Sequence, residues 1–253
     1  MDNFTHSCYN FQMLLAIDLG NTNIVFGFFK GRRLIREWRF PSGKFMLPSI
    51  KGPLEQVIVA SVVPGKDGSL RKKIKQTYHC APFFVTASNI PGLKVRLKNK
   101  KEIGADRVVD ALAAKRLYGV PAIVVDFGTA TTFDVISAKG EYLGGAIAPG
   151  IAMARDALYE MTAKLPKVKI TAPKNVIGKN TVSAMQSGLV YGYVAMVEGM
   201  VNKLKTKNSK LKIKVVATGG LAKLICKHTK VVDRIDAELT LKGLQMIGEG
   251  IND

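Results

Sequence analysis

The feature that most constrains this chain is a pattern that occurs twice. An apolar strand ends on aspartate, a glycine-containing turn follows, and a second apolar strand begins. The first copy, LLAIDLGNTNIVFGFF, covers residues 14–29, and the second, AIVVDFGTATTFDVIS, covers 122–137. A hairpin needs only the turn, so a carboxylate at the end of a buried strand points to a further purpose.

A second pair of similar stretches follows in the same order, IVASVVPG at 58–65 and VVATGGLA at 215–222. In each, an apolar strand passes through a small hydroxyl residue into a glycine-containing turn. Two echoes in one order indicate a duplicated lobe, in which a hairpin comes first and a strand–turn–helix follows. The sequence therefore predicts an α/β fold with lobes at 13–118 and 119–253, preceded by a flexible extension at 1–12.

The remaining elements follow from hydrophobic periodicity and from turn residues. QVIVASVV is a short continuous apolar run, which is typical of a buried parallel strand. Pro64 to Ser69 are expected to break this strand, and a helix is predicted from Leu70. Strands are predicted at 14–18, 24–29, 33–40 and 56–63, and helices at 70–78, 105–119, 152–162, 181–205 and 240–250.

The chain has 253 residues and a formal net charge of +19, from 38 basic and 19 acidic residues. Lysines on solvated surfaces explain such a charge, a nucleic-acid partner is the alternative, and anionic substrates would also benefit from the field. The basic clusters lack the interleaved aromatic side chains on which bases stack, which argues against nucleic acid. They are KVRLKNKK (94–101), KLPKVKI (164–170) and NKLKTKNSKLKIK (202–214).

The cysteines and the hydropathy of the chain indicate the cellular compartment of the protein. Cys8, Cys80 and Cys226 are odd in number and far apart, which indicates free thiols and a cytoplasmic protein. No apolar run approaches the roughly 20 residues of a membrane span. Residues 1–12 lack the basic start and apolar core of a secretion signal. The sequence therefore predicts no membrane partner.

The two aspartate turns carry the groups that phosphoryl transfer needs. Glycine lets backbone amides approach a phosphate closely, and asparagine and threonine offer further donors. Aspartate can hold Mg²⁺ through water, since this ion prefers oxygen ligands and keeps its waters. Such transfer depends mostly on positioning and on charge neutralisation. A plain type I′ hairpin stays the alternative for DLGNTN, and neither a P-loop nor GxGxxG occurs in the chain.

Six motifs in one order resemble those of the type III pantothenate kinases, in the acetate and sugar kinase/Hsc70/actin superfamily. The resemblance implies two ribonuclease H-like (actin-like) lobes with a nucleotide cleft between them. It also implies transfer of the ATP γ-phosphate to the primary hydroxyl of pantothenate, the first step of coenzyme A synthesis. The motifs are DLGNTN (18–23), GADR (104–107), DFGTATT (126–132), GGAIAPG (144–150), IGKNTVSAMQSG (177–188) and ATGG (217–220).

The resemblance assigns the catalytic base to Asp106. This residue lies in the first turn of a predicted helix, where the positive helix end should favour its ionised form. The alternative is that the charge of Asp106 only stabilises the helix end and takes no part in the chemistry. Arg107 is expected to anchor the pantothenate carboxylate with its forked guanidinium, or else to lie at the surface or in a salt bridge. The pantothenate contacts implied are Gly104, Ala105, Asp106, Arg107 and Thr181.

Nucleotide and ion contacts are implied in the same way. Asp126 resembles the family's ligand for a monovalent cation, K⁺ or NH₄⁺, and Asp18 is expected to hold Mg²⁺ through water. Thr181 has an alternative as the N-cap of the helix that follows, and ATGG has one as a simple strand–helix turn. The ATP contacts implied are Asp18, Leu19, Gly20, Asn21, Thr22, Asn23 and Thr129.

The chain departs from the family pattern just before GADR. Leu97 stands where the family often has a tyrosine, and Lys100 stands where a proline follows the asparagine, here Asn99. A lost buried hydrogen bond typically costs about 0.5–1.5 kcal/mol, so substrate binding would weaken without abolishing turnover.

Two further functions stay open beside the kinase. One is an inactive family member that binds nucleic acid as a regulator, and the other is a kinase for a different small hydroxylated substrate. The regulator predicts binding that falls steeply with salt, although a pure binder has no need of acidic turn residues. A homodimer is expected, with the apolar helix at 186–200 as a candidate interface; the same helix could equally be buried core.

Overall fold

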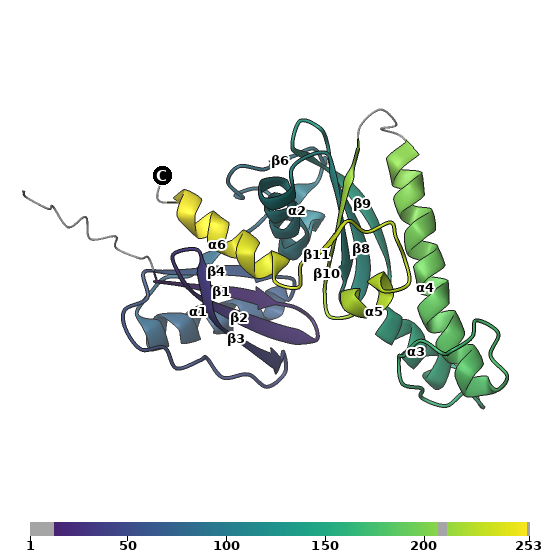
Figure 1. The fold of residues 1–253 in the computed structure, drawn as a ribbon. Coiled ribbons are helices and arrows are strands. Elements are labelled where there is room, and N and C mark those ends of the chain that lie inside the picture. Colours follow the sequence, from purple (N-terminus) through teal and green to yellow (C-terminus); the bar gives the residue numbers. More distant parts are fainter. Residues whose placement is uncertain (1–12, 207–211, 252–253) are drawn as a thin grey trace, which may run out of the picture. The chain divides into compact units, whose positions relative to one another are not determined.

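The structure is a computed structural model that describes residues 13–206 and 212–251 (Figure 1). It divides into two compact units: the first holds the residues up to Val85 and those from Leu244 onward, and the second holds Thr86–Gly243. Each unit is described by itself, and the nucleotide cleft expected between the lobes stays a prediction. The predicted extension at 1–12 lies outside the described residues.

The first unit is built on a five-stranded sheet in the order β3-β2-β1-β4-β5. β1 and β2 form the predicted hairpin, and β4 lies parallel to β1. Apolar and β-branched residues dominate the central strands, because such residues pack well on a buried pleated surface. The strands are β1 (Met13–Leu19), β2 (Asn23–Lys30), β3 (Arg33–Pro41), β4 (Gln56–Ser61) and β5 (Phe83–Phe84).

The second unit contains a six-stranded sheet in the order β11-β10-β7-β8-β9-β6. β7, β8 and β9 form an antiparallel meander, and β10 lies parallel to β7. The order β9-β8-β7-β10-β11 repeats the order β3-β2-β1-β4-β5, which confirms the duplicated, actin-like α/β lobes. The strands are β6 (Lys94–Val95), β7 (Ala122–Phe127), β8 (Ala130–Ile136), β9 (Glu141–Pro149), β10 (Lys214–Thr218) and β11 (Arg234–Ile235).

The second pair of similar stretches is confirmed as a strand in each lobe, and the sheets place the two hydroxyl residues one position apart. Matching the two stretches by their hydroxyl residues places Ser61 against Thr218. In the sheets, however, Asp18 pairs with Ala60, whereas Asp126 pairs with Thr218. Both strands are continuous apolar runs, which lack the alternation that would fix a register in the sequence.

Helix α1 begins at Pro64, earlier than predicted. The predicted end of the strand before Pro64 is confirmed, since β4 ends at Ser61. The predicted start of the helix at Leu70 was wrong, because proline is tolerated at the first position of a helix, where an N–H would have no partner. The other predicted helices are confirmed to within two residues at their ends. Within the described part of the chain, none of the helices is long and apolar enough to cross a membrane. The helices are α1 (Pro64–Tyr78), α2 (Ala105–Tyr118), α3 (Ile151–Glu160), α4 (Thr181–Thr206), α5 (Ala222–Cys226), α6 (Leu239–Ile251) and the 3₁₀ helix η1 (Lys100–Glu102).

The core of the first unit lies between its sheet and α1. The fully buried side chains of this helix, Leu70 and Ile74, pack in one cluster with residues of β1 and β4, among them Leu15, Ile17 and Val59. Removal of this apolar surface from water, at about 25 cal/mol per Å², is the main stabilising contribution.

In the second unit, α2 and α4 cover opposite faces of the sheet (Figure 1). Odd-numbered residues of β7, such as Ile123 and Val125, pack in one cluster with Val190 and Val197 of α4. Because side chains alternate along a strand, Asp126 points to the other face, the face that α2 covers. This alternation brings the aspartate of the second turn to the side of the sheet on which GADR begins its helix.

Residues 86–118 belong to the second unit by their packing. β6 pairs with β9, and α2 contacts β7 and β8. The lobe boundary predicted after residue 118 marks where the repeated pattern restarts, and it stays a prediction about the duplication. Packing divides the chain after Val85.

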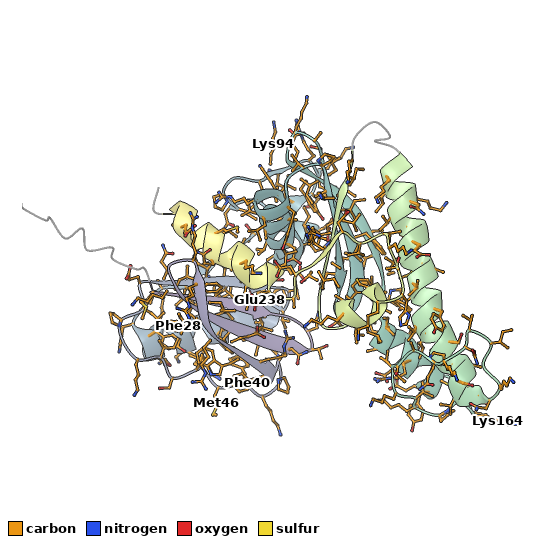
Figure 2. The ribbon with its side chains drawn as sticks, in the orientation of Figure 1. Phe28, Phe40, Met46, Lys94, Lys164 and Glu238 are labelled. Carbon is orange, nitrogen blue, oxygen red and sulfur yellow. The ribbon has the colours of Figure 1, made fainter. Side chains whose placement is uncertain are left out.

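Two of the basic stretches lie far apart. Lys94 and Lys164 project from opposite ends of the second unit (Figure 2). The stretches to which they belong, 94–101 and 164–170, therefore do not merge into one charged surface on this unit.

Candidate active site

The GADR motif lies at the start of α2. Gly104 is the N-cap residue, with φ −57° and ψ 139°, and provides no side-chain cap. Ala105 is buried beneath the first turn. The backbone N–H of Arg107 donates to Oδ1 of Asp106 at 2.8 Å, so the carboxylate satisfies an N–H group of the helix end. The helix thus fixes both Asp106 and Arg107 at its positive end.

The expectation that Asp106 has a favoured ionised form was wrong. Burial raises the pKa of Asp106; the N–H of Arg107 lowers it, and the nearby Asp134 carboxylate raises it further. Desolvation of the charged form outweighs the helix end, because one N–H bond replaces only part of the lost hydration. A raised pKa makes this carboxylate a stronger base than the sequence predicts.

Arg107 forms a salt bridge with Asp134 of β8. Its Nε and Nη2 lie 2.9 and 2.7 Å from Oδ1 of Asp134. The arginine and aspartate side chains are 15 % and 1 % exposed, so the pair is shielded from water. The salt-bridge alternative is therefore confirmed. It leaves donors in place, since a guanidinium has five N–H bonds and this pair uses two.

Two further side chains complete the coordination of Asp134. The hydroxyl of Tyr142, on β9, donates to Oδ1 at 2.7 Å, and that of Thr132 donates to Oδ2 at 2.9 Å. Burial and the charge of Asp134 raise the pKa of Tyr142, which keeps its phenol protonated as a donor. With Arg107, these donors satisfy both carboxylate oxygens, as a buried charge requires.

Sequence reasoning missed Asp134 and Tyr142. The signal was present: Asp134 interrupts the apolar run of β8, between Phe133 and Val135, and all three residues are buried. A charged residue at a buried strand position needs partners, and Arg107 is a cation in the first turn of the covering helix.

Asp126 is the second-last residue of β7, one position before the strand ends, and glycines crowd its carboxylate. A Cβ at Gly128 would lie 3.1 Å from Oδ2 of Asp126. Gly219, with φ +88°, allows no Cβ at all, because it would overlap Oδ1 and lie 2.6 and 2.7 Å from backbone atoms of Phe127. ATGG is thus a close-packed turn against Asp126 rather than a simple strand–helix connection.

Three carboxylates and one guanidinium lie near one another where α2 covers β7 and β8. Burial raises the pKa of Asp126 to about 7, and the charges of Asp106 and Asp134 contribute to the rise. With only Arg107 to balance them in this network, the ionised carboxylates leave an excess of negative charge. A monovalent cation bound by oxygen would relieve it. In residues 13–206 and 212–251, no group of three or more His, Cys, Asp or Glu is arranged to enclose a metal ion.

The DFGT turn itself is held by close backbone packing. Thr129 is exposed between β7 and β8. A Cβ at Gly150, in GGAIAPG, would overlap the carbonyl oxygen of Thr129 and lie 2.8 Å from that of Gly128. Gly150 therefore allows the start of α3 to pack directly against the backbone of the turn.

The first aspartate turn lies in the first unit. Asp18 is half-buried at the end of β1, and the N–H of Gly20 donates to the carbonyl of Asn23 at 2.9 Å to close the turn. Asn21 and Thr22 at its tip are exposed. Leu19 is fully buried, so it can offer a ligand only its backbone.

Thr181 is exposed at the start of α4. The N-cap alternative for Thr181 was wrong. Asn180 is the cap, since its Oδ1 accepts from the backbone N–H of Ser183 at 2.9 Å. Thr181 is consequently the first helical residue.

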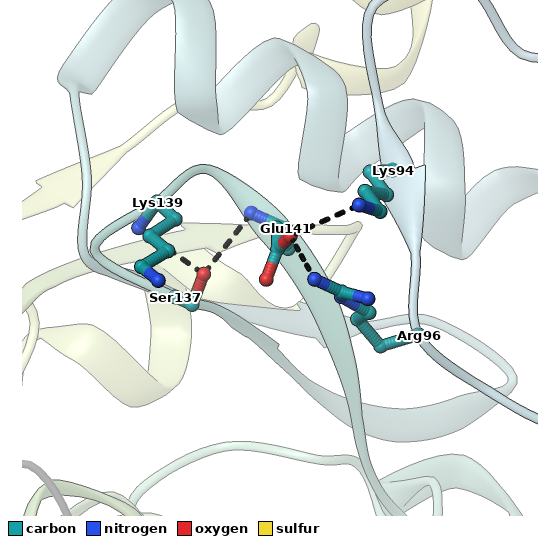
Figure 3. Close-up of polar contacts among 5 residues, drawn as sticks. All are labelled: Lys94, Arg96, Ser137, Lys139 and Glu141. Carbon is teal, nitrogen blue, oxygen red and sulfur yellow. Dashed lines mark hydrogen bonds and ion pairs between the residues drawn. The ribbon is translucent and has the colours of Figure 1, made fainter.

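The stretch that departs from the family pattern is firmly attached to β9 (Figure 3). Arg96 donates to Glu141 at 2.6 Å, and Lys94 lies 3.8 Å from the same carboxylate oxygen. The side chain of Leu97 packs over Gly144, where a Cβ would lie 3.3 Å away. Oδ1 of Asn99 accepts from the backbone N–H of Lys101 at 3.2 Å and caps η1.

Comparison with known proteins agrees with these features. The sequence profile of the type III pantothenate kinases matches residues 14–203. A type III pantothenate kinase of Moorella thermoacetica is 46 % identical over 252 residues, covering 94 % of this chain and 99 % of the relative. One from Halalkalibacterium halodurans is 43 % identical over 250 residues, covering 93 % and 98 %. A crystal structure of a Baf family protein from Campylobacter jejuni shares the fold, with a TM-score of 0.66 at 20 % identity over 94 % of this chain and 100 % of that one.

Proposed function

The chain belongs to the type III pantothenate kinase family, and we propose that it transfers the γ-phosphate of ATP to the primary hydroxyl of pantothenate, the first step of coenzyme A synthesis. The observation that carries this proposal is the start of α2, where a carboxylate with a raised pKa stands next to a guanidinium fixed by a buried aspartate.

Asp106 is the base of the proposed reaction. As the pantothenate oxygen forms its bond to the γ-phosphorus and the bond to ADP breaks, the hydroxyl proton passes to the Asp106 carboxylate. The raised pKa of Asp106 favours acceptance of that proton. Because the proton leaves late in such transfers, the carboxylate acts mainly by orienting the hydroxyl.

Arg107 is the proposed anchor for the pantothenate carboxylate. Its salt bridge to Asp134 fixes the plane of the guanidinium and uses two of its five N–H bonds. The remaining donors form the planar fork that suits a carboxylate. Gly104 and Ala105 support this geometry through the backbone, and Thr181 stays a predicted substrate contact.

The phosphates of ATP are assigned to the turn at 18–23 in the first unit. Thr129, in the second unit, stays a predicted ATP contact. Asp18 is positioned at the end of a strand, where its carboxylate could hold water molecules of Mg²⁺. When bound, Mg²⁺ would neutralise charge on the phosphates. The residues present fit this ion, since the turn offers a carboxylate beside exposed amide and hydroxyl side chains.

Asp126 is the proposed ligand of a monovalent cation, K⁺ or NH₄⁺. The support is electrostatic: burial and two neighbouring carboxylates raise its pKa, and a cation would relieve that repulsion. Such an ion would supply positive charge beside the reacting groups.

We also propose a homodimer, with a contact surface different from the one the sequence indicated. One face of α4 is buried core, which confirms the alternative given for that helix; its buried residues are Met185, Leu189, Val190, Val194, Val197 and Val201. Large apolar side chains instead remain exposed around α3 and the loop that precedes α4, with Met161 and Ile177 84 % and 82 % exposed. Apolar groups gathered in this way mark a protein contact.

The oligomeric state tests this surface directly. Sedimentation should show a dimer for the unaltered chain and a monomer for Ile177→Asp. Met46→Asp is the matched control, because Met46 is also an exposed apolar residue, at 76 %, but belongs to the first unit. A monomeric unaltered chain, or equal behaviour of the two variants, would contradict the proposed surface.

The cytoplasmic location and the lack of a membrane partner stay predictions.

The experiment that tests the reaction is a coupled assay of ADP release with MgATP and pantothenate, in K⁺ and in Na⁺. We expect turnover that requires pantothenate and is faster in K⁺. Parallel assays replace pantothenate with other small hydroxylated acids. ADP release with one of these acids alone would mean that the chain phosphorylates a different acceptor, and no acceptor-dependent release would contradict the kinase.

A further inference from the structure

The turn at 18–23 in the first unit is held by one buried residue, Ser42. The Oγ of Ser42 donates to the carbonyl of Gly20 at 2.6 Å, and its backbone N–H donates to the carbonyl of Thr22 at 2.9 Å. Ser42 is only 2 % exposed. Two of the turn's carbonyls therefore accept from Ser42, while the side chains of Asn21 and Thr22 at the tip are exposed.

Lys66, on helix α1, also forms a hydrogen bond with Ser42. Its Nζ donates to the carbonyl of Ser42 at 2.8 Å, so its ammonium lies against the residue that holds the turn. Lys66 is the third residue of the helix, whose first turn favours acidic side chains and disfavours basic ones. A lysine in this place raises the local positive charge of the helix end, and the hydrogen bond to Ser42 fixes where that charge lies.

The charge of Lys66 is not neutralised within the described part of the first unit. No carboxylate there lies within ion-pair distance of its ammonium. The neighbouring Asp67 accepts instead from the hydroxyl of Ser61 at 2.5 Å. An ammonium has three N–H bonds, and Ser42 accepts one. The side chain is half-buried, which strengthens its interaction with an anion relative to a fully solvated lysine.

We propose that Lys66 contacts the phosphates of the nucleotide at the turn 18–23, and that Ser42 couples this lysine to the turn. The inference deepens the proposed function and rests on it. Neither residue belongs to the motifs that carry the family resemblance, and they come from two segments that the sequence separates. Lys66 supplies a point charge to the phosphates, and Ser42 is a positioning residue that acts through the turn and through Lys66.

The test is the affinity of the full chain for MgATP and for adenosine, measured by calorimetry at several salt concentrations. Lys66→Met should weaken MgATP binding about tenfold to a hundredfold, the range for a hydrogen bond to a charged group, and should leave adenosine unaffected. It should also make MgATP binding less dependent on salt. Lys66→Arg keeps the charge and should retain most of the affinity. Lys72→Met is the matched control, because Lys72 is an exposed lysine of the same helix.

The variant Ser42→Ala tests the positioning role of Ser42 separately from the charge of Lys66. It removes the hydrogen bond to Gly20 but keeps Lys66, so MgATP should bind more weakly with unchanged salt dependence. Equal MgATP affinity for Lys66→Met and Lys72→Met, with both folded by circular dichroism, would overturn the inference while the kinase proposal stands. An unaltered chain that binds no MgATP would instead overturn the proposed function, and this inference with it.

Discussion

Nε and Nη2 of Arg107 both bind one oxygen of Asp134, at 2.9 and 2.7 Å. The same oxygen accepts from the hydroxyl of Tyr142 at 2.7 Å. A single buried carboxylate on β8 therefore sets the orientation of the arginine that begins α2. The guanidinium plane is decided by the sheet beneath the helix and not by the GADR motif itself.

Removing the charge of Asp134 should affect both stability and substrate binding. Asp134→Asn leaves Arg107 without its buried counter-charge, so we expect the free energy of unfolding to fall by about 3 kcal/mol. Because Arg107 loses its fixed plane, KM for pantothenate should rise about tenfold or more, with a smaller change in kcat. Denaturant unfolding and steady-state kinetics measure the two effects.

A matched control for that variant is Asp156→Asn. Asp156 is ion-paired with Arg155 and Lys167 at the surface of the same unit. Exposed pairs contribute about 0–1 kcal/mol, so stability and kinetics should change little. Equal effects of the two substitutions would show that Asp134 has no particular role in positioning Arg107.

Asp106→Asn should abolish turnover while the fold is retained. Loss of a general base typically lowers kcat by about 10² to 10⁴. Because burial raises the pKa of Asp106, its ionised form is disfavoured in the folded state, and the neutral amide should unfold at the same or a higher temperature at pH 7. The coupled assay and thermal unfolding provide both readouts. Retained turnover would mean that another group accepts the proton.

Asp126 should make stability depend on pH when K⁺ and NH₄⁺ are absent. Its pKa of about 7 in the folded chain lies above the value of about 3.9 in an unfolded one. Between these values the folded state binds more protons, so the free energy of unfolding should fall as pH rises from about 4 to about 7. Urea unfolding across this range, in a buffer with a bulky organic cation, measures the slope.

Two comparisons identify Asp126 as the source of that slope. Asp126→Asn cannot ionise, so its slope should be smaller than that of the unaltered chain. Added K⁺ should stabilise the unaltered chain most at the high-pH end, where the carboxylate is ionised, and should not stabilise the variant. The same slope in both proteins would assign the pH dependence to other groups.

Gly219→Ala and Gly220→Ala form a matched pair of substitutions in ATGG. A Cβ at Gly219 would meet Asp126 and the backbone of Phe127, and its φ of +88° strains any other residue. A Cβ at Gly220 would meet nothing within 4 Å. Overpacking costs about 1–3 kcal/mol, so Gly219→Ala should lower the unfolding temperature and the activity, whereas Gly220→Ala should change neither. Thermal unfolding with the coupled assay checks both.

The sequence by itself determined the repeated hairpins and most of the helices, and it predicted the roles of Asp106, Arg107 and Asp126. These features depend on local signals. Apolar runs, turn residues and motif order can be recognised without knowing which helices and strands pack together. For the same reason β6 and β11, which each pair over only two residues, were missed. Pairs this short carry no periodic pattern.

Only the tertiary structure decided which groups meet and in what electrostatic state. The raised pKa of Asp106 depends on desolvation by residues distant in sequence, so the local helix end gave the wrong direction. Asp134 and Arg107 are joined by a strand register, and Ser42 and Lys66 by the packing of a helix against a turn. Burial and contact are properties of the folded chain, and they set the charge, orientation and reach of residues that the sequence could only name.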